Sequence, residues 1–115
     1  MTAARSHVTT HVLDSTIGRP AAGVPVILEH DDLGNWVMLA SAETDADGRV
    51  EHFGPEALPA GRYRVTFDTA TYFHEQEVKA FYPEVHIVFE LADPAAHYHV
   101  PLLLSPFAYS TYRGS

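Results

Sequence analysis

The chain has 115 residues, no cysteine, and a formal net charge of −8, with seven lysine and arginine residues against fifteen aspartate and glutamate residues. The length predicts a single domain over residues 1–115 with a core of its own. The absence of cysteine excludes disulfides, a thiol nucleophile and a thiolate metal site, and the acidic balance argues against nucleic acid or an anionic membrane as a partner.

The composition also indicates whether the chain folds and where in the cell it is expected. Hydrophobic residues make up 46% of the chain and charged residues 19%, which argues against disorder. No apolar run approaches the length of a membrane span, and residues 1–7 contain no apolar signal segment. We therefore expect a soluble, cytoplasmic protein.

Short strand-like runs separated by turn residues predict an all-β sandwich or barrel. The first run is His7 to Leu13. Two further runs, Val24 to His30 and Trp36 to Ala42, predict a hairpin closed by a five-residue loop from Asp31 to Asn35.

The segment Asp45-Ala46-Asp47-Gly48 predicts a tight turn into a short strand, Arg49 to Phe53. A calcium loop could begin in this way. However, such a loop needs polar ligands in its middle, where this chain has His52 and Phe53.

Two later runs alternate between apolar and polar residues and predict strands, Arg62 to Asp68 and Val85 to Leu91. Between them, Thr69 to Val78 predicts one short helix, with Thr69 as its N-cap and with Phe73 and Glu77 on one face.

The run from His97 to Ser105 predicts a strand with large apolar groups on both faces. Leu103 shares one face with His97 and His99, and an apolar set occupies the other face: Tyr98, Val100, Leu102 and Leu104. A half-exposed antiparallel strand of a monomer should not have two apolar faces, so we expect a partner subunit to cover one of them. Pro101 lacks an N–H donor, which predicts that this strand is an edge strand or is interrupted there.

Eight histidines are a rich supply of ligands and bases. His97 and His99 share a face, as two metal ligands would, and His11 could complete a zinc site. The chain has no HExxH motif, Cys/His knuckle or carboxylate-rich triad, so we expect no metal and keep zinc as an alternative.

Two histidines and an arginine also suit the hydrolysis of a planar amide by water. A neutral histidine can take a proton from water, and arginine can hold a carbonyl and stabilise its oxyanion. A serine hydrolase is disfavoured because no Gly-x-Ser-x-Gly elbow is present.

The chain ends in an apolar run followed by Tyr109-Ser110-Thr111-Tyr112-Arg113-Gly114-Ser115. Most termini fray into polar residues. This one is predicted to dock on the domain, either as a recognition group or as a last edge strand with a polar tip.

These motifs carry a resemblance to a known family. His11-Val12-Leu13-Asp14, Thr44 to Arg49, His97 to Pro106 and the terminal Tyr-Arg-Gly-Ser are similar to the transthyretin-related 5-hydroxyisourate hydrolases. The resemblance runs from about His7 to Ser115. It implies a transthyretin-like fold of two four-stranded sheets, about eight strands, with one short helix.

The resemblance further implies a homotetramer, a dimer of dimers, with active sites at the dimer–dimer interface. It implies hydrolysis of 5-hydroxyisourate to 2-oxo-4-hydroxy-4-carboxy-5-ureidoimidazoline in urate breakdown, without a cofactor. The family's functional residues carry over to seven positions: His11, Arg49, His99, Tyr112, Arg113, Gly114 and Ser115.

In the implied mechanism, water attacks the C6 carbonyl of the substrate and the N1–C6 bond breaks. His11 or His99 is the general base, with His11 preferred, and Arg49 binds the substrate and stabilises the oxyanion. Tyr112 and the terminal groups of Arg113, Gly114 and Ser115 hold the ring. The competing interpretation is a non-catalytic small-ligand carrier like transthyretin, which has the same fold.

Overall fold

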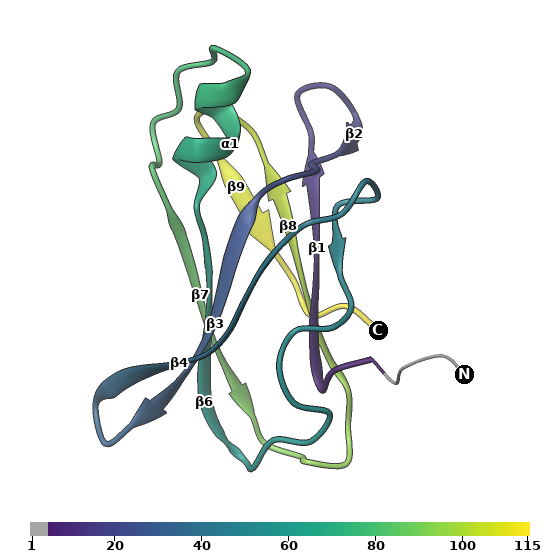
Figure 1. Cartoon of the computed structure of the whole chain (residues 1–115), viewed down its shortest axis with the longest axis vertical. Coiled ribbons are helices and arrows are strands. Elements are labelled where there is room, and N and C mark those ends of the chain that lie inside the picture. Colours follow the sequence, from purple (N-terminus) through teal and green to yellow (C-terminus); the bar gives the residue numbers. More distant parts are fainter. Residues whose placement is uncertain (1–4) are drawn as a thin grey trace.

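The computed structural model describes residues 5–115; residues 1–4 of the predicted domain lie outside the described part. Within residues 5–115 the chain forms nine strands and one helix, arranged as two sheets that face each other (Figure 1). One sheet has the order β2-β1-β8-β9, with β5 also paired to β1, and the other has the order β4-β3-β6-β7. The bounds are β1 Val8–Asp14, β2 Arg19–Pro20, β3 Pro25–Asp32, β4 Asn35–Glu43, β5 Arg49–Val50, β6 Gly61–Phe67, α1 Thr69–Glu75, β7 Val85–Leu91, β8 Tyr98–Leu104 and β9 Tyr109–Thr111.

The core lies between the two sheets, and alternation along each strand fills it. Successive side chains of a strand point to opposite faces, so one set of residues in each strand faces the other sheet. Val8 and Val12 of β1 meet Val65 and Phe67 of β6, all fully buried. The predicted sandwich is confirmed, with five and four strands because the short pairings of β2 and β5 both lie along β1.

The position of β1 decides what its outer face can carry. β1 pairs in parallel with β8, which sets Thr9 opposite His99, and antiparallel with β5, which sets His11 opposite Arg49. Paired residues of neighbouring strands point to the same face of a sheet. The outward residues of three strands therefore gather beside one another.

The hairpin of β3 and β4 is tighter than predicted. Asp31 and Asp32 continue the ladder, pairing with Trp36 and Asn35, and only Leu33 and Gly34 form the turn. Both turn residues have positive φ, 52° and 91°, which is the backbone of a two-residue hairpin turn. The prediction of a five-residue loop was wrong because aspartate is frequent in loops but can also pair at the end of a strand.

The helix α1 is shorter than predicted and begins with a different cap. The N-cap is Asp68, whose side chain accepts from the Thr71 N–H, whereas Thr69 is buried and its hydroxyl donates to the Tyr82 carbonyl. The helix ends at Glu75, and Glu77 has a φ of 57°, so it does not share a face with Phe73. No helix in residues 5–115 is long and apolar enough to span a membrane.

β8 is an inner strand, between β1 and β9, and the prediction of an edge strand was wrong. The alternative, an interruption of the strand at Pro101, was also wrong, because β8 runs unbroken from Tyr98 to Leu104 and Pro101 pairs with His11 of β1. Only the ladder to β9 has a gap there. The regular pairs with β9 cover only Leu102 to Leu104, and beyond Pro101 a single bridge joins His99 to Gly114. The missing N–H of proline falls on the β9 side, where the ladder has its gap.

Other strand ends differ from the prediction by one or two residues, as strand ends commonly do. β1 starts at Val8, not His7, and β8 spans Tyr98–Leu104. β5 is confined to Arg49–Val50 because residues 51–60 leave the sheet as a loop. The turn at Asp45 is confirmed, since its carboxylate accepts from the Asp47 and Arg49 N–H groups.

Candidate active site

Three of the predicted functional side chains meet on the outer face of the β2-β1-β8-β9 sheet. β1 contributes His11, β5 contributes Arg49 and β8 contributes His99. The rings of His11 and His99 lie 6.5 Å apart between centroids. The strand register alone places these side chains together, since His11 is paired with Arg49 and Thr9 with His99.

Thr9 lies between two histidines. Its Oγ1 is 2.8 Å from Nδ1 of His99 and 2.9 Å from Nε2 of His97, and the Thr9 side chain is only 3% exposed. The hydroxyl therefore fixes one edge of the His99 ring. From the sequence, His97 was only a candidate zinc ligand, and Thr9 had no predicted part in the site. The two-residue spacing of Thr9 and His11 on one strand face is the signal that could have included it.

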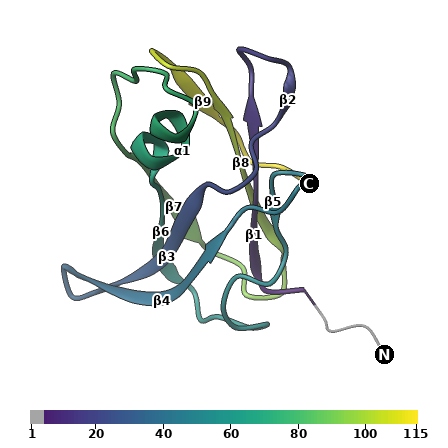
Figure 2. The ribbon, with the colours of Figure 1, turned by 45° about the horizontal axis from the view of Figure 1, so that its top comes forward.

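The C-terminal segment docks against His99. The Gly114 N–H donates to the His99 carbonyl at 2.9 Å, and a Cβ on Gly114 would lie 2.4 Å from Cδ2 of the His99 ring. Only glycine allows this approach without displacing the ring. Ser115 then lines a cavity of about 60 Å³ together with Arg49 and His99, and the segment ends close to β1 and β5 in both views (Figures 1 and 2).

Tyr112 and Arg113 line a second cavity. It has a volume of about 260 Å³ and is also lined by His99 of β8 and by Ile87 and Phe89 of β7, and the Arg113 guanidinium lies 4.4 Å above the Tyr98 ring. Within one chain, Gly114 and Ser115 therefore reach the cluster of His11, Arg49 and His99. Tyr112 and Arg113 border the neighbouring cavity, which His99 also lines.

The surroundings of the site favour neutral histidines. Burial lowers the pKa of His99 below its ordinary value, and Arg49, His11, His97 and Arg5 lower it further by opposing a positive charge. Burial also lowers the pKa of His97, with Arg5 and His7 adding to the effect. A neutral imidazole beside a guanidinium can accept a proton while the arginine binds an anionic or carbonyl oxygen.

The zinc alternative finds no ligand set in the part of the chain that the structure describes. Across residues 5–115, no group of three histidine, aspartate or glutamate side chains is arranged to hold a metal ion. One ring nitrogen of each of His97 and His99 lies within hydrogen-bond distance of Thr9 Oγ1.

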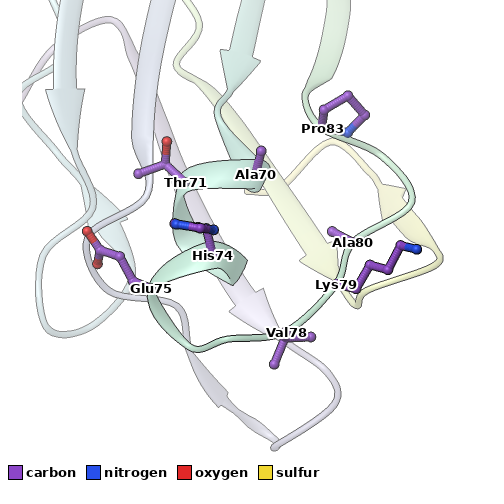
Figure 3. Close-up of a pocket in the computed structure, with 8 residues that line it drawn as sticks. All are labelled: Ala70, Thr71, His74, Glu75, Val78, Lys79, Ala80 and Pro83. Atoms are coloured by element: carbon purple, nitrogen blue, oxygen red, sulfur yellow. The ribbon is translucent and has the colours of Figure 1, made fainter.

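A larger cavity lies away from this cluster. It has a volume of about 460 Å³ and runs between α1 and the segment that follows it, from Ala70 to Pro83 (Figure 3). None of the predicted functional residues lines it. Although this cavity is larger, it lacks the two histidines and the guanidinium that lie together on the β2-β1-β8-β9 sheet, so it is not the candidate active site.

Comparison with known proteins places the chain among similar sequences. Residues 8–114 match the transthyretin family, described as the HIUase/Transthyretin family. A 5-hydroxyisourate hydrolase of Salmonella dublin is 43% identical over 116 residues, covering 100% of this chain and 85% of that relative.

Solved structures with the same fold include both an enzyme and a transthyretin. The 5-hydroxyisourate hydrolase of Klebsiella pneumoniae matches with a TM-score of 0.84 at 37% identity, covering 94% of this chain and 98% of that one. Transthyretin from Sparus aurata matches with a TM-score of 0.90 at 34% identity, covering 96% and 97%. The fold is thus common to both kinds of protein, and the side chains on it must distinguish them.

Proposed function

The chain belongs to the HIUase/transthyretin family, and we propose that the cluster of His11, Arg49 and His99 is the active site of its hydrolase activity. It is an enzyme of urate degradation that hydrolyses 5-hydroxyisourate. One observation supports this site: two histidines, a guanidinium and the C-terminal Ser115 converge on one sheet face.

The proposed reaction adds water across the amide bond between C6 and N1 of the six-membered ring. The water oxygen bonds to C6 while a histidine takes one of its protons. The tetrahedral oxyanion is stabilised by Arg49, since a guanidinium in a sheltered site stabilises developing negative charge. The C6–N1 bond then breaks, a proton passes to N1, and C6 becomes a carboxylate. No cofactor is needed for these steps.

The surroundings of the two histidines support His99 as the base, in place of the preferred His11. His99 is held by Thr9 and by the Gly114 backbone, and its lowered pKa keeps the ring neutral. A base that is already oriented and neutral needs no reorganisation when it accepts a proton. His11, whose ring lies beside His99, then orients the substrate or protonates the leaving nitrogen.

The C-terminal residues and the association of subunits also belong to the proposed site. Ser115 borders the cavity beside Arg49 and His99. Tyr112 and Arg113 are proposed to bind substrate once subunits come together, because in one chain they line a different cavity from Arg49 and Ser115. A homotetramer, a dimer of dimers with sites between the dimers, and a cytoplasmic location remain predictions.

The test is to generate 5-hydroxyisourate in situ from urate with urate oxidase and to follow its ultraviolet decay. We expect catalytic amounts of this protein to accelerate the decay, and the variant His11→Ala or His99→Ala to lose most of the acceleration. Decay at the spontaneous rate, from folded protein, would favour the carrier interpretation. Full activity in both histidine variants would contradict the assignment of this cluster as the active site.

A further inference from the structure

The hydrogen bonds of Thr9 constrain the protons of two histidine rings. A hydroxyl has one proton, so Thr9 can donate to His97 or to His99 but not to both. At least one ring must therefore carry a proton on the nitrogen that faces Thr9. Because Thr9 is buried on the strand next to β8, water does not readily replace either contact.

The His99 ring has one nitrogen left for chemistry. Its Nδ1 is taken by Thr9, and its Cδ2 edge packs against Gly114. Nε2 makes no hydrogen bond within residues 5–115, on the face where Arg49 and His11 also lie. This nitrogen is the one that water or substrate can reach.

We propose that Thr9 and His97 are positioning residues, which hold His99 with its proton on Nδ1 and with the Nε2 lone pair free for water. This inference rests on the proposed function and on the assignment of His99 as the base. In this arrangement the Nδ1–H of His99 donates to the Thr9 oxygen, and the Thr9 hydroxyl donates to Nε2 of His97. His97 then carries its own proton on Nδ1.

The arrangement stabilises the base at the moment it is needed. When Nε2 of His99 takes a proton, the ring becomes a cation, and the Thr9 oxygen accepts from its Nδ1–H. His97 keeps that oxygen turned toward His99 by accepting the hydroxyl proton. A catalytic triad orients its histidine base with a carboxylate in the same way. Here the Thr9 hydroxyl and the His97 imidazole take the place of that carboxylate.

The charged neighbours are consistent with a neutral resting pair. Arg5, Arg49 and His11 oppose a proton on His99, and Arg5 and His7 oppose one on His97. Two carboxylates border the same region, Glu51 beside the His99 cavity and Glu56 beside a cavity of about 210 Å³ that His97 lines.

The direct test needs no variant and no activity. Nitrogen-15 NMR of the unmodified protein, with labelled histidine, reports which ring nitrogen carries the proton. We expect His97 and His99 both to be protonated on Nδ1 near neutral pH. A His99 ring with its proton on Nε2 would overturn the proposal, whatever the enzyme's turnover.

The kinetic test compares Thr9→Val with Thr9→Ser, and His97→Ala with His97→Gln. We expect Thr9→Val and His97→Ala to lower kcat by about tenfold or more with a smaller effect on KM, because both residues are proposed to act through the His99 ring. Serine restores the hydroxyl, and the glutamine amide can still accept from Thr9, so both should retain most of kcat. Thr66→Val is the matched control, since Thr66 bonds His86 on the other sheet.

The pH profile separates orientation from mere packing. Loss of the Thr9 oxygen removes the acceptor for the charged ring, so in Thr9→Val the acid limb of kcat/KM should move to lower pH. A Thr9→Val enzyme with the kcat and pH profile of the Thr66→Val control would contradict the proposal. An inactive wild-type protein with both rings protonated on Nδ1 would instead contradict the proposed function alone.

Discussion

A free ring nitrogen beside Arg49 separates His99 from the structural His7 in this protein. His7 uses both nitrogens on the backbone: Nδ1 accepts from the Leu58 N–H at 2.8 Å, which leaves the Nε2–H to donate to the Ala96 carbonyl at 2.7 Å. Its tautomer is fixed and it has nothing left for a substrate. His99 has one nitrogen held and one free, which is the pattern that a general base requires.

At the residue scale, the shape of the Arg49 side chain should matter as much as its charge. Arg49→Lys keeps the charge but loses the planar fork that holds a carbonyl oxygen, so kcat/KM should fall by roughly 10²-fold. The measurement is the ultraviolet decay of 5-hydroxyisourate. The matched control is Arg62→Lys on the other sheet, where Arg62 makes only an exposed pair with Asp31 at 3.9 Å. Equal activity in the two variants would exclude an oxyanion role for Arg49.

The pH dependence also belongs to single residues. Burial and nearby positive charges lower the pKa of His99, so the ring stays neutral to a lower pH than an ordinary histidine. As a base it works only when neutral. The acid limb of kcat/KM should therefore have its midpoint below the ordinary histidine pKa of about 6.5. A midpoint above this value in a pH–rate profile would contradict His99 as the base.

At the scale of elements, a few pairings assemble the site from distant parts of the chain. β1 joins residues near the start of the chain to β8, and one bridge beyond the gap at Pro101 docks the C-terminal segment on His99. Within residues 5–115, the segment after Thr111 pairs with the sheet only through this bridge. We therefore expect function and folding to be separable in the last residues.

Deletion of residues 112–115 tests this separation. β9 keeps its three pairs with β8, from Leu102 with Thr111 to Leu104 with Tyr109, so the sandwich should still fold. Activity should be lost because Ser115 and the Gly114 contact are removed. Circular dichroism and the decay assay measure the two properties. Full activity after truncation would show that residues 112–115 have no part in the active site.

A second element, α1, is tied to β1 by one buried hydrogen bond. The Tyr72 hydroxyl donates to Oδ2 of Asp14 at 2.7 Å, and Asp14 is 2% exposed. Burial, together with the Asp14 carboxylate, raises the pKa of Tyr72 to about 12, so the hydroxyl remains a donor at neutral pH.

Tyr72→Phe should therefore leave a buried carboxylate with fewer donors and lower the free energy of unfolding by about 1–3 kcal/mol. Denaturant unfolding measures this loss. Tyr109→Phe is the control, because the Tyr109 side chain is 41% exposed and its hydroxyl makes no hydrogen bond within residues 5–115. Equal stability of the two variants would show that the tie contributes nothing. Turnover should be nearly unchanged in both.

At the scale of the whole molecule, the isolated chain leaves several apolar side chains in water. Ile17 in the β1–β2 loop is 54% exposed, Phe107 in the β8–β9 loop is 68% exposed, and Tyr112 is 57% exposed. Exposed groups of this size on neighbouring loops suit burial by another subunit. This agrees with the predicted partner subunit on the outer face of β8, where Leu103 is only half-buried.

Sedimentation equilibrium tests the predicted assembly. We expect a species of four copies of the 12.7 kDa chain, and replacement of Phe107 by Glu should weaken it by placing a charge in an apolar contact. A monomer at micromolar concentration that retains full activity would contradict both the tetramer and the proposal that Tyr112 acts across an interface.

The sequence by itself determined the sandwich, the short helix and the family, because these depend on local patterns. Alternation in Arg62 to Asp68 and Val85 to Leu91 predicted two strands correctly, since the period of two follows from strand geometry alone. The terminal Tyr-Arg-Gly-Ser and the His97 to Pro106 run were sufficient to indicate the hydrolases. The same patterns gave wrong predictions for the β3–β4 turn and for the N-cap of α1. In both places the residue types present are compatible with more than one position.

Only the tertiary structure decided which residues meet. Nothing in the sequence reveals that β1 runs parallel to β8, so the contacts of Thr9 with His97 and His99 could not be read from it. Nor could the sequence show that Ser115 lines one cavity beside His99 while Tyr112 and Arg113 line another. Local patterns fix the period of a strand, but its neighbours and register depend on packing between distant segments.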